Sequence, residues 1–150
     1  MHAAAPWIPG EHQIRPSPET LELKAVQMDT AERFYTTMSD FVWDLVFNFP
    51  TKMQPDGKLS SGVPPGGEKK RVFAPNEFPY QIEGGGRHYI MWYSYGPPDD
   101  LAEADVDADI AQALREEVLK HDRFEFAWYE NPVMTIPGIY HVQVFWHETT

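Results

Sequence analysis

Apolar residues recur at helical spacing in two segments of the sequence. The first segment covers residues 29–49, and its apolar positions fall on one helical face: Phe34, Met38, Phe41, Val42, Leu45 and Val46. Asp29 and Glu32 form a capping-box pattern at its start, and Pro50 follows its end. The second segment covers residues 101–121, with an apolar face made of Leu101, Val106, Ile110, Leu114 and Val118. The spacing therefore predicts two main helices.

Four shorter segments carry the aromatic, β-branched and alternating residues that are typical of strands. They are "KRVFAP", the segment from about 87 to 95, "RFEFAWY" and "GIYHVQVFW". The last two are joined by a short loop, so antiparallel pairing is their simplest arrangement. Because one helix stands between strands, the pattern predicts an α+β fold, an antiparallel aromatic-rich sheet with two main helices.

Prolines and glycines mark the segments that we expect to lie outside these elements. Residues 1–28 contain Pro6, Pro9, Pro16 and Pro18, which favours an extended, proline-rich N-terminal arm. Residues 51–70 have no hydrophobic period and predict a long loop, either a binding segment or a surface insertion. The sequence thus predicts an arm at 1–28 and a single domain at 29–150.

Composition narrows the classes of function. A chain of 150 residues fits one domain. Its formal charge of −11 argues against general nucleic-acid binding, which needs a basic surface. Zero cysteines exclude disulfides and thiolate chemistry, and no apolar run is long enough to span a membrane. Because the N-terminus also lacks a signal-peptide pattern, we expect a protein of the cytoplasm or nucleus that is not secreted.

The candidate chemistry lies on the last predicted strand. Residues two apart in a strand share a face, which groups His141, Gln143, Phe145 and His147. The same rule groups His88, Ile90, Trp92 and Ser94 on the earlier strand. Strand pairing would bring His88 towards His141 in one register, which the sequence does not specify. A histidine there can act as a base, a nucleophile or a metal ligand, or it can be a hydrogen-bonded sheet residue.

The same histidines are also candidate metal ligands. His88, His141 and His147 are three imidazoles that neighbouring strands can bring together, but no closely spaced pair of histidines supports a site. We therefore expect no metal and no cofactor.

Three stretches give the sequence a resemblance to a known family. "PNEFPYQIEGGGRHYIMWY", "WYENP" and "TIPGIYHVQVF" together resemble the fungal N-acetylglucosamine-induced-protein family, an uncharacterised domain family also found in large DNA viruses. The resemblance covers about residues 30–147. The family pattern closes on a His-x-His-Val-Phe strand, and this chain has Gln143 at the second histidine.

The order of elements is also similar to the histidine-triad superfamily, whose proteins bind nucleoside phosphates and transfer or hydrolyse them. The resemblance implies a histidine-triad-like arrangement with His141 first, Gln143 in the nucleophile position and Phe145 third. A carboxamide is a poor nucleophile, so Gln143 argues against turnover, although the sequence leaves the question of catalysis open. Trp92 and Trp128 are either stacking platforms for a base or core residues.

The leading hypothesis is a binding domain for a nucleotide- or sugar-phosphate-type ligand with a degenerate histidine strand. Its expected ligand-binding residues are Asn131, Thr135, His141, Gln143 and His88. One alternative is a phosphoester hydrolase or nucleotidyl transferase that uses His141 or His88. Another is an acidic protein-interaction module. The candidate partners are a small phosphorylated ligand and a protein partner or second copy of the chain.

Overall fold

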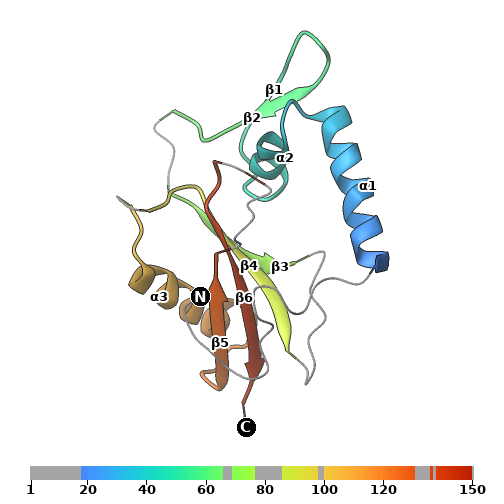
Figure 1. The fold of residues 1–150 in the computed structure, drawn as a ribbon. Helices are drawn as coiled ribbons and strands as arrows, with labels where there is room; N and C mark the ends of the chain where they lie inside the picture. The colour runs from blue at the N-terminus through green and yellow to red at the C-terminus, as the bar shows by residue number, and fades with distance from the viewer. Residues whose placement is uncertain are drawn as a thin grey trace.

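The computed structural model confirms the α+β fold (Figure 1). It describes residues 18–65, 69–76, 86–97, 100–130, 136 and 138–149. Within these ranges the elements are α1 (Pro18–Phe34), α2 (Met38–Leu45), β1 (Thr51–Met53), β2 (Leu59–Ser61), β3 (Arg71–Pro75), β4 (Arg87–Tyr93), α3 (Glu103–Ala113), a π-helical turn (Leu114–Val118), β5 (Phe124–Tyr129) and β6 (His141–Glu148). No helix in these ranges is both long enough and apolar enough to cross a membrane.

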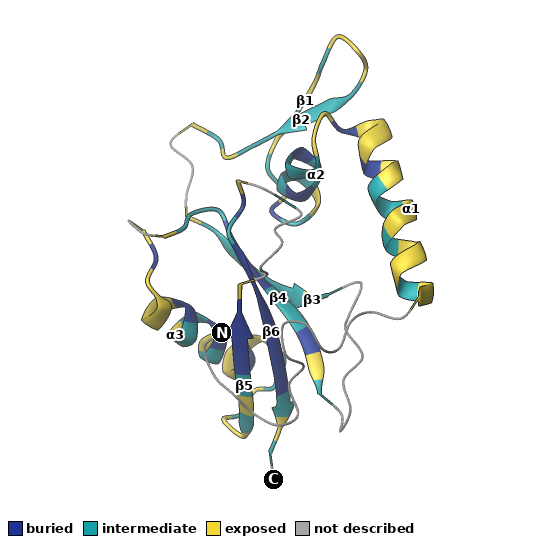
Figure 2. Cartoon of the chain, in the orientation of Figure 1, coloured by how far each residue is buried: buried dark blue, intermediate teal, exposed yellow. Residues whose placement is uncertain are grey.

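The main sheet has four strands in the order β3-β4-β6-β5, and every neighbouring pair is antiparallel. The expected pairing of the last two strands is therefore confirmed. β6 lies between β4 and β5, and six consecutive residues from its start are buried (Figure 2). The register sets Trp92 opposite His141 and His88 opposite Phe145. Strand alternation then decides which side chains face α3 and which face away from it.

One face of the sheet packs on α3 and the π-helical turn. Aliphatic and aromatic side chains fill this layer: Met91, Tyr93, Leu101, Val106, Ile110, Ala113, Leu114, Trp128, Val142, Val144 and Trp146. These residues include Leu101, Val106, Ile110 and Leu114 of the expected apolar helix face. The helix ends in one wider turn, in which the Leu119 N–H donates to the Leu114 carbonyl at 2.8 Å. The predicted second helix is thus confirmed in position and in buried face.

The opposite face meets the end of α2. Val42 and Phe47 pack with Trp92 and Ile139 in a second apolar cluster. The chain leaves α2 through Asn48, whose φ of 58° is left-handed. Asparagine tolerates that conformation better than most residues, so it suits a position just after a helix. Val72 of β3 and Ile90 of β4 also pack against this cluster.

The predicted extended arm at 1–28 is wrong for its last residues. α1 begins at Pro18 and runs through residues 19–28 as a helix. Proline is favoured in the first turn because its missing N–H has no helical partner there anyway, and the stretch after it contains good helix formers and no proline. Residues 1–17 lie outside the described residues. α1 stands to one side of the body, beside α2 (Figures 1 and 2).

The first predicted helix is also wrong in its boundaries. No helix starts at Asp29, because α1 continues through it, and Phe34 is 59% exposed rather than buried. The helical conformation is interrupted between α1 and α2, where the Thr36 N–H donates to the Leu59 carbonyl at 2.9 Å. Thr37 then caps α2 by accepting from the Asp40 N–H at 3.1 Å. The break separates a peripheral helix from a core helix.

Part of the predicted loop at 51–70 is a β-hairpin. β1 and β2 pair in antiparallel fashion, and Gly57 in the turn between them has a φ of +85°, which glycine adopts without strain. The Asp40 carboxylate accepts from the Ser61 N–H at 2.8 Å and holds the hairpin to α2. The missed signal is "PDG" in residues 55–57, a turn sequence. Residues 66–68 lie outside the described residues.

Candidate functional site

The face of the sheet turned away from α3 carries the histidines and Gln143. His88, Ile90 and Trp92 of β4 lie opposite Phe145, Gln143 and His141 of β6. Cross-strand partners share a face, so the expected grouping of these residues is confirmed. The register places His88 diagonally beside Gln143 instead of beside His141. The two histidines therefore belong to different parts of the face.

His88, Gln143 and Asn76 form a buried polar cluster, which we call the amide–imidazole cluster. His88 Nε2 lies 2.5 Å from Gln143 Oε1, and both side chains are 5% exposed. Asn76 Nδ2 lies 3.4 Å from the same oxygen and 3.3 Å from His88 Nε2. The arrangement is consistent if both nitrogens donate to the carboxamide oxygen. Asn76 was not among the site residues expected from the sequence, although it is the asparagine of "PNEFPY" and follows β3 directly.

Aromatic rings hold the imidazole of His88 in place. Its ring stacks on Phe145 at 4.4 Å between centroids, and Phe145 stacks on Tyr129 at 5.5 Å. Burial lowers the pKa of His88 to about 4, and the hydrogen bond to Gln143 offsets only part of that effect. His88 is therefore neutral at physiological pH, with its Nε2 already engaged. This state suits a fixed hydrogen-bond donor better than a proton shuttle.

His141 has a separate set of partners. Its Nδ1 lies 2.9 Å from the Ile139 carbonyl oxygen, which requires a proton on Nδ1. Its ring stacks on Trp92 at 4.7 Å, and the side chain is 4% exposed. Burial lowers the pKa of His141 as well. Trp92 thus stacks on a histidine of the protein itself.

The other expected site residues do not join these two. Asn131 and Thr135 lie outside the described residues. His147 Nε2 lies 3.2 Å from the Glu125 carboxylate of the neighbouring strand. Trp128 is a core residue, 3% exposed, whose indole N–H donates to Asp107 at 2.9 Å. Over the described ranges, no cluster of three or more His, Asp or Glu side chains is arranged to hold a metal ion.

An open groove lies at the other end of β4, where it meets the start of β6. It has a volume of about 390 Å³, within the usual range for small-molecule sites. The described residues that line it are Tyr93, Ser94, Tyr95, Gly96, Pro97, Gly138, Ile139 and Tyr140. The Tyr93 N–H donates to the Tyr140 carbonyl at 3.0 Å and fixes the two walls together. We call this feature the tyrosine groove.

Glycine makes the close packing of the two walls feasible. A Cβ atom placed on Gly96 would lie 3.1 Å from Tyr140 Cβ, closer than side chains normally pack. Gly138 has a φ of +84°, which other residues rarely adopt. Both positions therefore shape the groove through the backbone.

Carboxylates hold two of the three tyrosine rings of the groove, those of Tyr93 and Tyr140, through their hydroxyl groups. Tyr93 meets Tyr95 edge to face at 5.3 Å and lies 5.9 Å from Tyr140. The Tyr93 hydroxyl donates to Asp109 at 2.8 Å, and the Tyr140 hydroxyl donates to Glu130 at 2.8 Å. Since a hydroxyl bound to a carboxylate holds its ring in one orientation, the groove has a preformed aromatic lining.

The tyrosine groove was not predicted from the sequence. His88, His141 and Gln143, the expected site residues that the structure describes, are absent from its described lining. The available signals were tyrosine beside glycine in "SYGPP" and "PGIY". Tyr95 and Tyr140 are 45 positions apart in the sequence, and the pairing of β4 with β6 brings their segments together.

The sequence matches no known family model and no curated protein. A crystal structure described as that of "HTC1" resembles this chain with a TM-score of 0.55 at 17% sequence identity. The similarity covers 87% of this chain and 74% of that chain. At that identity the likeness supports the fold alone.

Proposed function

We propose that this domain binds a small molecule in the tyrosine groove and does not catalyse its conversion. The observation that carries the proposal is the groove itself, an open volume of about 390 Å³ in which the rings of Tyr95 and Tyr140 are partly exposed and the buried ring of Tyr93 lies behind them. Tyrosine rings offer large faces for stacking on a sugar or a base and bury area at little entropic cost. The walls of the groove are the residues that follow β4 and those that precede β6, and the hydrogen bond from the Tyr93 N–H to the Tyr140 carbonyl joins them.

The histidine face supports a binding role over the enzyme alternative. Gln143 stands in the expected nucleophile position, and its oxygen lies 2.5 Å from His88 Nε2. His141 Nδ1 is bound to a backbone carbonyl, and its ring is covered by Trp92. A hydrolase or transferase that uses His141 or His88 would need these contacts to break before either ring met a substrate. We therefore assign the amide–imidazole cluster to holding β4 and β6 in register at the end of β4 opposite the groove.

The structure offers fewer contacts for the phosphate group of the expected ligand than for its sugar or base ring. Lys69 pairs with Asp100 at 3.4 Å, and Arg71 pairs with Asp109. Lys70 Nζ donates to the Phe47 carbonyl at 2.5 Å. These cations near the groove therefore already have partners. A nucleotide- or sugar-phosphate-type ligand remains the prediction from the sequence, to be tested against unphosphorylated compounds.

The test is a binding screen with site assignment. Amide NMR spectra of the full chain are recorded with nucleotides, nucleotide sugars, sugar phosphates, nucleosides, free sugars and organic ammonium compounds. We expect at least one class to shift the signals of Ser94, Gly96 and Tyr140. Gly96→Ala should weaken that binding because its Cβ collides with Tyr140, whereas Gly62→Ala, with no atom within 4 Å of its Cβ, should not. The proposal fails if every class leaves the groove signals unchanged.

The alternative that this chain is an acidic protein-interaction module is tested by a separate experiment. Its basis was the acidic surface and the arm at 1–28, of which residues 18–28 belong to α1. Capture of a basic partner should then depend on the acidic surface and weaken as salt is raised. Recovery that is unaffected by salt and by deletion of residues 1–28 would remove the basis for this alternative.

A further inference from the structure

The electrostatic surroundings of the tyrosine groove indicate the chemical class of its ligand. Two of its three phenol groups, those of Tyr93 and Tyr140, donate to the carboxylates of Asp109 and Glu130. A hydrogen bond to an anion shifts electron density towards the phenol oxygen and ring. Because Tyr93 is fully buried, the ring that can present its more negative face to a cation is that of Tyr140, which is partly exposed.

Further acidic groups lie near the same rings. Burial raises the pKa of Tyr140, and its bond to Glu130 and the charges of Glu130 and Glu103 raise it further. Burial likewise raises the pKa of Tyr95, with additional contributions from Asp109 and Asp105 that the nearby Arg71 only partly offsets. The side of the molecule that carries the groove is thus acidic as well as aromatic.

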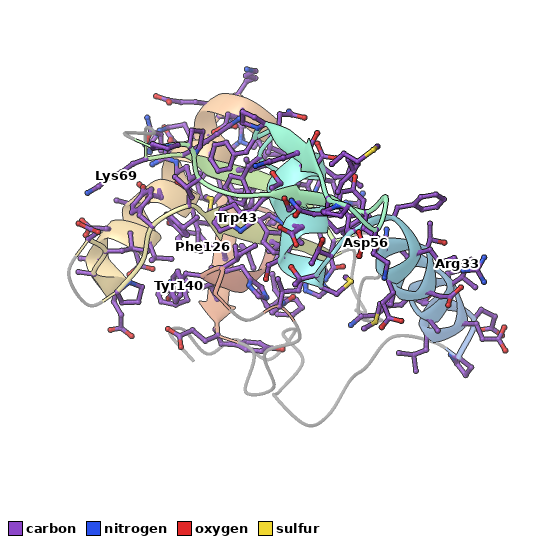
Figure 3. All side chains as sticks on the ribbon, turned by 90° about the horizontal axis from the view of Figure 1, so that it is seen from above. Arg33, Trp43, Asp56, Lys69, Phe126 and Tyr140 are labelled. Atoms are coloured by element: carbon purple, nitrogen blue, oxygen red, sulfur yellow. The ribbon has the colours of Figure 1, made fainter. Side chains whose placement is uncertain are left out.

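An ammonium group of the protein already occupies such a position. Lys69 Nζ lies 5.2 Å from the centroid of Tyr95, within the range of a cation–π contact. The same ammonium lies 3.4 Å from Asp100, and the Lys69 side chain is 61% exposed. Figure 3 shows Lys69 and Tyr140 on the same side of the molecule, beside α3. The contact places an ammonium group over the ring of a groove tyrosine with a carboxylate beside it.

We propose that the tyrosine groove binds a small organic cation, an ammonium-bearing molecule whose charged end lies against the partly exposed rings of Tyr95 and Tyr140 and whose charge is balanced by Glu130. The inference rests on the proposed function and specifies its ligand class. Tyrosine faces supply the cation–π attraction, and the fixed carboxylates supply the long-range field. An anionic ligand would meet the same carboxylates at a cost.

The experiment compares probes that differ in charge and little in shape. Choline carries a trimethylammonium group, and 3,3-dimethylbutan-1-ol is its neutral isostere. Binding of each to the full chain is measured by NMR titration of the groove signals, with adenosine monophosphate as the anionic probe. We expect choline to bind about tenfold more tightly than the neutral alcohol, since that is the scale of a partly desolvated cation–π contact.

Two charge variants give opposite expected results. Glu130→Gln keeps an acceptor for the Tyr140 hydroxyl but removes the charge, and it should weaken choline binding about threefold to tenfold. Lys69→Gln removes a competing cation from an exposed side chain and should leave choline binding unchanged or up to about threefold tighter. For an anionic ligand, both effects would have the reverse sign.

The possible outcomes distinguish the cation assignment from the proposed function, small-molecule binding in the groove. The cation assignment would be overturned if the neutral alcohol bound as tightly as choline or more tightly. It would also be overturned if adenosine monophosphate bound in the groove and Lys69→Gln weakened that binding. In either case the proposal that the groove binds a small molecule would stand. If no probe in this set or in the wider screen shifted the groove signals, both would fail. Choline binding that Glu130→Gln left unchanged would also overturn the assigned role of that carboxylate.

Discussion

His88 Nε2 and Gln143 Oε1 lie 2.5 Å apart at a buried diagonal position between β4 and β6. This contact explains why a carboxamide suits position 143. A neutral histidine that is sealed from water needs an acceptor for its N–H, and a glutamine oxygen provides one without adding a buried charge. The residue that argues against a catalytic nucleophile thus has a structural role of its own.

Gln143→Leu should destabilise the fold by about 1–3 kcal/mol, because it leaves the His88 N–H buried without its strongest acceptor. The double variant His88→Leu with Gln143→Leu should recover much of that loss, since it removes donor and acceptor together. Urea unfolding of the wild type, both single variants and the double variant gives the coupling energy. Strictly additive losses would show that the two side chains do not interact.

The pH dependence of stability provides a second measurement on the same residue. Burial lowers the pKa of His88 from 6.5 to about 4, so the unfolded chain binds this proton more readily than the folded chain. The stability that neutral, buried His88 contributes to the fold is fully present above pH 6.5 and is lost as the pH falls towards 4. We expect His88 to account for about 3 kcal/mol of that loss. Urea unfolding of the wild type and His88→Gln across this window should show a flatter profile for the variant, and parallel profiles would contradict the assignment.

Much of the main sheet could be predicted from the sequence because its signals are local. Alternation in β6 and the aromatic content of β4 identify the strands and their faces. The apolar period of α3 identifies the buried side of that helix. The register could not be predicted, because sliding one strand by two residues keeps every side chain on the same face. This degeneracy is why the sequence left open whether His88 meets His141, and why the structure was needed to place it beside Gln143.

The errors near the N-terminus have a different cause. The capping-box pattern at Asp29 and Glu32 is a local signal that lies inside α1, where the backbone groups it would cap already have helical partners. The real boundary depends on contacts with Leu59, a residue distant in sequence. The tyrosine groove was missed for a related reason, since its two walls are adjacent only after β4 and β6 pair. Local patterns do not contain these long-range contacts.

Asp109 should be the most sensitive carboxylate on α3. It accepts from the fully buried Tyr93 hydroxyl and pairs with Arg71, whose side chain is 28% exposed. Asp109→Ala leaves both groups without this acceptor, and we expect a loss of about 2–4 kcal/mol in the free energy of unfolding. The matched control is Asp29→Ala, which breaks an exposed pair with Arg33 on α1 and should change stability by less than about 0.5 kcal/mol. Similar losses in the two variants would contradict this account.

The two buried histidines should occupy opposite tautomers at neutral pH. His141 Nδ1 faces the Ile139 carbonyl, which only accepts, so the proton must be on Nδ1. His88 Nε2 faces the Gln143 oxygen, so its proton must be on Nε2. Burial lowers the pKa of both, which keeps both rings neutral. Long-range ¹H–¹⁵N correlation spectra of the imidazoles distinguish the two forms, with Gln143→Leu and Trp92→Phe assigning each signal. An Nδ1-protonated His88 would mean that the Gln143 amide is reversed and donates to the ring, and a charged His141 at neutral pH would reopen its role as a proton donor.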